Sequence, residues 1–365
     1  MSQNYIEILR QSYRRVGNNI CLGVDPQWQK LPAPYRRKLP RKFSSGNEAP
    51  LVDCGALQDF LEQSLESLKS QQLSPAAFKP NAGYFQALDR PLLGLDSRHV
   101  KHSRHSRHLK HEEAGYSGNS PDMALKYAFG GSRLLAWLHC YLSEHFPGIP
   151  IILDFKKGDI ARSSANYAEE GFALWGSDAL TVSPYMGFDS LAPFGMDLRP
   201  HLESKGYPQD IVSQSCHLPC GSGGVYSLLR TSNPGGKDVQ NLLLKEDGEL
   251  PLYLALAGSL LRWRDELRIP GLGAVVGATS LRELDRLAGL FSRHEFPLLI
   301  PGVGGQGGSF REVLSSLNRA AYPLELSRIN LSSGLLQSWE GEAPDDWPRR
   351  ITEKFNALSD PSWGL

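Results

Sequence analysis

The chain has 365 residues, and its 39 Lys and Arg residues are balanced by 39 Asp and Glu residues. This balance excludes a general nucleic-acid binder, which needs an excess of cations. A hydrophobic fraction of 41% excludes wholesale disorder. No stretch approaches the ~18–20 apolar residues of a membrane span, and the N-terminus lacks the apolar segment of a secretory signal. We expect a soluble, cytoplasmic protein that binds neither membranes nor nucleic acid.

Short apolar runs alternate with longer amphipathic stretches along the chain. The predicted strands are Asn19–Val24, Ala77–Pro80, Ile149–Asp154, Ala179–Val182, Val225–Leu229, Gly273–Val276, Pro297–Ile300 and Arg328–Leu331. The predicted helices include Leu57–Lys69, Met123–Phe146, Ser163–Trp175, Leu252–Leu267, Leu281–Leu290 and Phe310–Leu317. Short, apolar strands of this kind are typical of a buried parallel sheet. The alternation predicts an α/β fold, a single (β/α)8 TIM barrel that spans residues 1–365 as one domain with loop insertions.

Two segments interrupt the alternation and predict insertions on barrel loops. The segment near residues 27–50 is rich in Pro, Lys and Arg, and the segment near residues 95–119 holds five of the ten histidines. We interpret the second as a solvated surface insertion, with a metal or polyanion site as the alternative. The five cysteines are scattered apart from Cys216 and Cys220, so no disulfide framework is expected. That pair is interpreted as two free thiols, with a metal or redox role as the alternative.

The strongest chemical signal is the D-x-K-x-x-D pattern of Asp154, Lys156 and Asp159, at the end of a predicted apolar strand. Residues two apart in a strand point to the same face, so Asp154 and Lys156 are expected to enter the barrel mouth together. Asp159 follows in the next loop and need not point the same way. A lysine held between aspartates stays protonated, which suits a proton donor. The alternative is a salt bridge at a strand end with no catalytic role.

Two further strands end in charged residues. Lys79 lies at the end of the second predicted strand, and Asp25 directly follows the first. Lysine is rarely placed at such a position for packing. In a barrel, the carboxyl ends of the strands form the mouth where catalysis occurs. We therefore expect Asp25, Lys79, Asp154 and Lys156 to converge there.

A glycine-rich run from Pro301 to Gly308 follows the seventh predicted strand. Glycines let backbone N–H groups approach an anion, and barrels commonly bind phosphate after strands seven and eight. The run matches neither a Walker A loop nor a dinucleotide fingerprint. After the fifth strand, Arg230–Gly235 offers hydroxyl and amide groups that could read the edge of a polar heterocycle; an ordinary Asn-Pro-Gly turn is the alternative.

Taken together, these segments resemble the orotidine 5′-phosphate decarboxylases, most closely the longer bacterial group often called type 2. The resemblance runs from Cys21 to about Leu336 and includes CLGVDP, FKPNAGYF, LDFKKGDI, DALTVSPYMG, RTSNPG, VVGATS and IPGVGGQGG in the family's order. It implies a (β/α)8 barrel that needs no metal and no organic cofactor. The implied reaction converts orotidine monophosphate to UMP and carbon dioxide, the last step of de novo UMP biosynthesis.

The resemblance also implies roles for individual residues. Lys156 falls on the proton donor, Asp154 on the carboxylate that faces the substrate's carboxylate, and Lys79 on the rest of the charged network. Asp159 falls on a residue that reaches into the neighbouring subunit, which implies a homodimer. The implied substrate-binding residues are Asp25 for the ribose hydroxyls, Ser163 for a hydroxyl contact, Ser232 for the pyrimidine, and Gly302 and Gln306 at the phosphate.

One departure from the family concerns the phosphate. The eighth strand is usually followed by an Arg that clamps it, whereas this chain has Ser333 at that position. Phosphate would then depend on Gln306, backbone N–H groups and Ser332, with Arg328 or a cation from an insertion as compensation. Two alternatives therefore stay open: a magnesium-dependent barrel of the same suprafamily that acts on sugar phosphates, and a UMP-binding pseudoenzyme. No metal site is expected on the favoured interpretation.

Overall fold

The computed structural model describes residues 4–25, 27–36, 52–89, 129–209, 223–245, 249–339 and 341–359. The predicted insertion near residues 95–119 and the Cys216–Cys220 pair lie outside the described residues, as does the first insertion beyond residue 36. The described part of that first insertion is ordered into two short 3-10 turns, η1 (Trp28–Lys30) and η2 (Ala33–Tyr35). The ring of Tyr35 packs edge-on against Phe60 and Trp347, which ties this segment to the helical layer.

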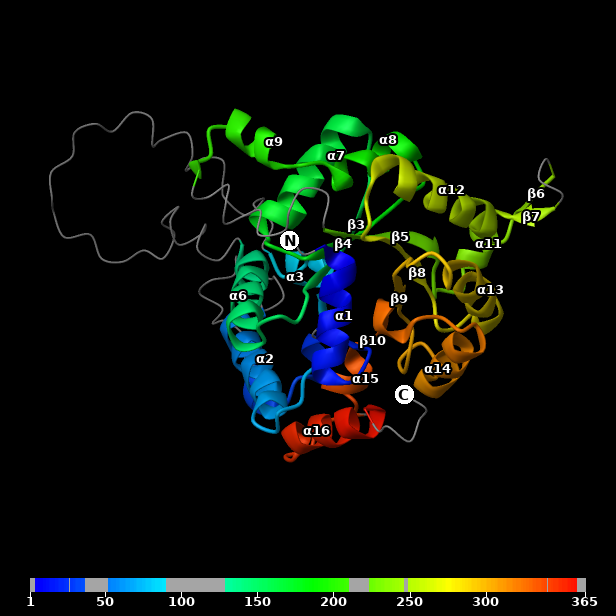
Figure 1. The fold of residues 1–365 in the computed structure, drawn as a ribbon. Helices are drawn as coiled ribbons and strands as arrows, with labels where there is room; N and C mark the ends of the chain where they lie inside the picture. Colours follow the sequence, from blue (N-terminus) through cyan, green and yellow to red (C-terminus); the bar gives the residue numbers. More distant parts are fainter. Residues whose placement is uncertain are drawn as a thin grey trace, which may run out of the picture.

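Eight parallel strands form one sheet, which confirms the predicted fold class (Figure 1). They are β1 (Ile20–Val24), β2 (Ala77–Pro80), β3 (Ile152–Lys157), β4 (Ala179–Val182), β5 (Gly224–Arg230), β8 (Leu272–Val276), β9 (Leu298–Ile300) and β10 (Ser327–Leu331). Their order is β2-β1-β10-β9-β8-β5-β4-β3. Isolated parallel bridges from Phe78 to Ile151 and from Asn81 to Asp154 join β2 to β3 and close the ring.

The helical segments follow the strands and cover the barrel (Figure 1). They are α1 (Tyr5–Val16), α2 (Cys54–Lys69), α3 (Ala82–Gln86), α6 (Gly130–His145), α7 (Ala161–Ala168), η5 (Glu169–Leu174), α8 (Phe188–Leu191), η6 (Ala192–Gly195), α9 (Arg199–Ser204), α11 (Gly236–Gln240), α12 (Leu252–Leu267), α13 (Leu281–Phe291), α14 (Phe310–Arg319), η7 (Leu324–Leu326), α15 (Ser333–Leu336) and α16 (Trp347–Leu358). A small antiparallel hairpin, β6 (Leu243–Leu244) with β7 (Leu250–Pro251), stands apart from the barrel.

Local capping explains where several helices begin. The Asn4 side chain accepts the Glu7 N–H at 3.0 Å and starts α1, and Asp53 accepts the Gly55 N–H at 2.9 Å and starts α2. Helix α1 ends at Gly17, whose φ of 68° is the left-handed conformation that glycine adopts at low cost. Such caps satisfy N–H and C=O groups that a helix end leaves without partners.

Helix α1 closes the amino-terminal end of the barrel. Its Tyr5 is fully buried, and a Cβ on Gly224 or Gly271 would lie within 3 Å of the Tyr5 side chain, so glycine is needed at the first residue of β5 and directly before β8. Arg328, at the start of β10, is also fully buried and donates to the carbonyl oxygens of Leu9 and Ala76. These contacts place the barrel's closed end opposite the strand ends that carry the charged residues.

Several predicted elements differ from the observed ones at their ends, and two of these differences concern the segment around the charged motif. The third strand runs from Ile152 to Lys157 rather than from Ile149 to Asp154, so it continues through the charged motif. The helix predicted over Ser163–Trp175 begins at Ala161 and changes at Glu169 into a six-residue π-helix, η5. The helix predicted to start at Met123 is described from Gly130 onward.

Candidate active site

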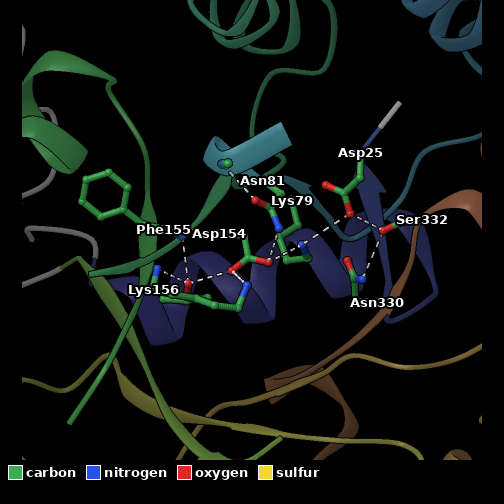
Figure 2. A network of polar contacts seen from close by, with 10 residues as sticks. Asp25, Lys79, Asn81, Asp154, Phe155, Lys156, Asn330 and Ser332 are labelled. Atoms are coloured by element: carbon green, nitrogen blue, oxygen red, sulfur yellow. Dashed lines mark hydrogen bonds and ion pairs between the residues drawn. The ribbon is translucent and has the colours of Figure 1, made fainter. Parts of the chain in front are cut away.

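Four charged side chains from three strand ends form a continuous chain of alternating sign (Figure 2). Asp154 lies at its centre, and its Oδ2 accepts from Nζ of Lys79 at 2.8 Å while its Oδ1 accepts from Nζ of Lys156. On the far side, Nζ of Lys79 lies 3.9 Å from Oδ2 of Asp25. The predicted convergence of these four residues is confirmed.

Burial and the neighbouring charges shift the pKa values of Asp154 and Lys79 in opposite directions. Burial alone would raise the pKa of Asp154, but the attraction of Lys79 and Lys156, with their hydrogen bonds, lowers that pKa well below its ordinary value. Burial likewise opposes the charged form of Lys79, but Asp154 and Asp25 raise its pKa well above the ordinary range. Both groups are therefore ionised at neutral pH, and each depends on the other to remain so.

The two lysines differ in access to solvent. The Lys79 side chain is 4% exposed, whereas the Lys156 side chain is 48% exposed. A ligand entering the mouth can therefore reach the Lys156 ammonium, while Lys79 is enclosed between its two carboxylates. The accessible lysine is the one that the sequence predicted as a proton donor.

The backbone conformation that brings Lys156 to Asp154 is not the regular strand that the sequence predicted. Its φ is 50°, in the left-handed region, and the pairing of β3 with β4 shifts register between Leu153 and Lys157. A residue with a Cβ is uncommon in that conformation. The two side chains meet because the strand bulges at this point, and simple alternation of side chains does not describe their arrangement.

Asp25 belongs to a second polar group, which the sequence did not single out as a unit. Ser332 Oγ donates to Asp25 Oδ2 at 2.6 Å, and Asn330 Nδ2 lies 3.5 Å from Ser332 Oγ (Figure 2). A Cβ on Gly23 would lie 2.0 Å from Ser332 Oγ, so this approach requires glycine at position 23. Oδ1 of Asp25 and Oδ1 of Asn330 are buried without a hydrogen-bond partner within the described part of the chain, and both can accept from a ligand.

The glycine-rich loop brings together the residues predicted for the pyrimidine and the phosphate. Gly302 has a φ of 102°, and a Cβ there would lie 2.9 Å from the Cβ of Ser232 and 3.1 Å from Oε1 of Gln306. The loop also bonds to itself, because the N–H groups of Gly304, Gly307 and Gly308 donate to carbonyls within it. These three N–H groups are occupied, so the expectation that backbone N–H groups of this loop bind phosphate does not extend to them.

The suggestion that Arg328 compensates for the missing phosphate Arg is wrong. Arg328 is fully buried at the opposite end of the barrel, where it donates to the carbonyls of Leu9 and Ala76 and to Ser12 Oγ. Ser332, also considered for phosphate, gives its proton to Asp25. Ser333 begins α15 beside the glycine-rich loop, with its Oγ 3.5 Å from the position of a Cβ on Gly305.

Asp159 and Ser163 follow β3 along the chain, and within the described residues neither makes a hydrogen bond or ion pair with the four charged residues. The Asp159 carboxylate accepts the N–H of Ile160 at 2.7 Å, and Ser163 lies in the first turn of α7. Among the described residues, no three His, Cys, Asp or Glu side chains are grouped so that they could hold a metal ion. Among the same residues, Cys21, Cys54 and Cys140 are free thiols.

A parallel eight-stranded barrel whose charged residues gather at the carboxyl ends of its strands has the architecture of a barrel enzyme. Residues 121–319 match the model of the orotidine 5′-phosphate decarboxylase / HUMPS family. A curated relative from Herpetosiphon aurantiacus, named orotidine 5′-phosphate decarboxylase, is 31% identical over 340 residues, which cover 93% of this chain and 91% of the relative. A relative of the same name from Ralstonia pickettii is 41% identical over 305 residues, covering 83% and 79% respectively. The chain belongs to the orotidine 5′-phosphate decarboxylase / HUMPS family.

Solved structures share the fold at lower identity. The crystal structure of Plasmodium berghei orotidine 5′-monophosphate decarboxylase superposes with a TM-score of 0.61 at 15% identity, covering 97% of each chain. The structure of Leishmania donovani OMP decarboxylase gives a TM-score of 0.55 at 23% identity, covering 98% of this chain and 99% of that one. These similarities support the barrel fold. Within the described residues, no helix is long and apolar enough to cross a bilayer.

Proposed function

We propose that this protein decarboxylates orotidine 5′-monophosphate to UMP and carbon dioxide, the last step of de novo UMP biosynthesis. The observation that carries this proposal is the buried chain Asp25–Lys79–Asp154–Lys156, which ends in an accessible ammonium at the barrel mouth. The family match and the names of the curated relatives support the same reaction. We further propose that residues 1–365 act as one decarboxylase domain in the cytoplasm.

The charged chain supplies the chemistry of the reaction. The bond between C6 of the pyrimidine and the carboxylate carbon breaks, carbon dioxide leaves, and the electron pair stays on C6. The Lys156 ammonium stabilises that pair and then transfers a proton from Nζ to C6. Asp154 faces the departing carboxylate, and the repulsion between like charges raises the energy of the bound substrate relative to the transition state. Lys79 keeps Asp154 ionised, so that repulsion persists at neutral pH.

The remaining polar groups hold the substrate. Asp25 presents Oδ1, which is buried and has no hydrogen-bond partner among the described residues, to the ribose hydroxyls. Ser232 reads the pyrimidine edge, Ser163 supplies a hydroxyl contact, and Gln306 with the loop at Gly302 receives the phosphate. The phosphate does not react, but its binding energy holds the pyrimidine against the four charged residues. No metal and no organic cofactor takes part in this scheme.

We propose that the active unit is a homodimer in which Asp159 completes the site of the neighbouring subunit. Asp159 lies beyond the network of its own subunit, in the loop after β3. The loops after β3 and β4 touch, because a Cβ on Gly158 would lie 2.5 Å from the Ser183 carbonyl oxygen. Exposed apolar side chains follow on the same loops and directly after η6: Ile160, Tyr185 (87% exposed), Met186 and Met196. A second copy of the chain would cover them.

The magnesium-dependent alternative is not favoured. Both oxygens of Asp154 already accept from lysine ammonium groups, and Oδ1 also accepts from the Thr181 hydroxyl at 2.8 Å. A metal ion at Asp154 would have to displace these donors. The curated relatives reported above carry the decarboxylase name, which also favours the first reaction.

The test is the ultraviolet absorbance of orotidine monophosphate incubated with purified protein, with and without EDTA. We expect substrate absorbance to fall at the same rate in both. Turnover that EDTA abolishes would contradict the proposal and indicate a magnesium-dependent reaction. If absorbance stays constant while calorimetry detects UMP binding, the protein is a nucleotide-binding pseudoenzyme and Ser333 marks the lost function.

A further inference from the structure

The strand that carries the catalytic motif is longer than its neighbour by two residues at the motif itself. Leu153 pairs with Leu180 and Lys157 pairs with Val182, so three residues of β3 lie opposite Thr181 alone. Lys156, within this bulge, has the left-handed φ of 50°. A bulge removes the regular ladder partners of the inserted residues, and their N–H groups must find other acceptors.

The side-chain hydroxyl oxygen of Thr181 is the acceptor for two of these N–H groups. Its Oγ1 accepts the N–H of Phe155 at 2.9 Å and the N–H of Lys156 at 3.0 Å. The same hydroxyl donates to Oδ1 of Asp154 at 2.8 Å. A threonine hydroxyl has one proton and two lone pairs, so all three are used. The side chain is 1% exposed, and water cannot easily replace it in this role.

The hydrogen bonds of the Thr181 hydroxyl therefore link the carboxylate of Asp154, the backbone of Lys156 and the direction of the Lys156 side chain. With both lone pairs occupied by backbone donors, the hydroxyl proton must point at Asp154. The backbone at Lys156 is held in a conformation that a residue with a Cβ adopts only where its surroundings hold it. The direction in which the Lys156 side chain leaves the strand depends on that backbone conformation, and so does the position of its ammonium.

We propose that Thr181 is a positioning residue for the decarboxylation: it fixes the bulged backbone of Lys156 and one oxygen of Asp154, and thereby sets the proton donor at the reacting carbon. This inference rests on the proposed function for its catalytic consequence. The hydroxyl acts through Lys156 and Asp154, which themselves meet the substrate. Misplacement of a reacting group by about 1 Å costs roughly 100-fold in rate, which sets the scale of the expected effect.

The experiment compares Thr181→Val, which keeps the shape and removes the hydroxyl, with Thr181→Ser, which keeps the hydroxyl. We expect Thr181→Val to lower kcat by about 10- to 100-fold with KM changed less than about threefold, and Thr181→Ser to retain most of the wild-type kcat. Thr352→Val is the matched control, because Thr352 is a buried threonine on α16 whose hydroxyl donates to the Arg349 carbonyl, outside the charged network. Its kcat should equal that of the wild type.

Hydrogen exchange provides a second measurement that does not need activity. The amides of Phe155 and Lys156 should exchange slowly in the wild type and in Thr181→Ser, and faster in Thr181→Val, with distant amides unchanged. If Thr181→Val does not fold, Thr181→Cys replaces it, since a thiol is a weak acceptor for the two N–H groups.

Either of two results would overturn the inference: a Val or Cys variant with wild-type kcat, or rapid exchange of both amides in the wild type. A wild type that does not turn over orotidine monophosphate would refute the proposed function instead. In that case the exchange pattern still decides whether Thr181 holds the bulge.

Discussion

Replacement of Lys79 by Met tests the charge balance at the centre of the site. The Lys79 ammonium is almost fully buried, 2.8 Å from one carboxylate and 3.9 Å from another. With an effective dielectric constant of about 20, these separations correspond to gross attractions of about 6 and about 4 kcal/mol. The cost of burying the ammonium offsets much of this attraction, but its removal leaves Asp154 and Asp25 as buried charges with less compensation.

The four residues sum to zero charge, and each single substitution disturbs that balance. Lys79→Met leaves an excess negative charge and should lower the free energy of unfolding by about 3–5 kcal/mol, the usual cost of breaking a buried ion pair. Asp154→Asn leaves an excess positive charge and should also destabilise the protein. The double variant restores a neutral site, so it should be more stable than the sum of the single effects predicts, by at least about 1 kcal/mol.

Urea unfolding of the wild type, both single variants and the double variant at pH 7.5 measures this coupling. All three variants should be inactive, so stability is the informative readout. Additivity of the two single effects within about 0.5 kcal/mol would refute the reasoning, because it would mean that the two charges do not stabilise each other.

Three further predictions follow from the same structure. Lys156→Ala should abolish turnover but retain UMP binding by calorimetry, and mixing it with inactive Asp159→Ala should restore partial activity through hybrid sites; no recovery despite proven subunit exchange would contradict a shared site. His139 is buried, and burial lowers its pKa from 6.5 to about 4. Between these two pH values the unfolded chain binds a proton at this residue and the folded protein does not. Stability should therefore fall by about 2 kcal/mol from pH 7 to pH 5 through this residue, and by about 3 kcal/mol in total near pH 4. His139→Asn should remove that part of the pH dependence in urea unfolding, whereas substitution of the exposed His294 should leave it intact. Gly302→Ala should raise KM more than about tenfold, because its Cβ would meet Ser232 and Gln306; Gly176→Ala, also at positive φ but in open space, should leave KM unchanged.

The strands could be located from the sequence because each is a short apolar run between residues that end strands. Their burial on both faces explains why the signal was strong: helices cover one side and barrel side chains fill the other. The same reasoning failed at β3, where apolar character ended at Asp154 but the strand continued to Lys157. Charged residues within a strand carry no hydrophobic signal, so the sequence placed the strand end too early.

Some residues of the site could likewise be predicted from the sequence, and others could not. Asp25, Lys79, Asp154 and Lys156 could be found because charged residues at strand ends of a barrel have few reasons to be there except chemistry. Ser332 was not recognised as the partner of Asp25, because short polar residues after a strand are common and the two residues are far apart along the chain. Arg328 was misjudged for a similar reason, since its sequence neighbours do not reveal that it faces the closed end of the barrel.

The sequence by itself determined the barrel, the charged motif and the family resemblance, because these depend on residue type and on spacing along the chain. Only the tertiary structure decided how the charges are paired, which lysine is accessible, and what holds the backbone of Lys156. These features depend on groups that are far apart in sequence, as Asp25 is from Ser332 and Asp154 is from Thr181. Hydrogen bonds act over about 3 Å and are directional, so they are set by how strands pair and bulge, which residue spacing alone does not encode.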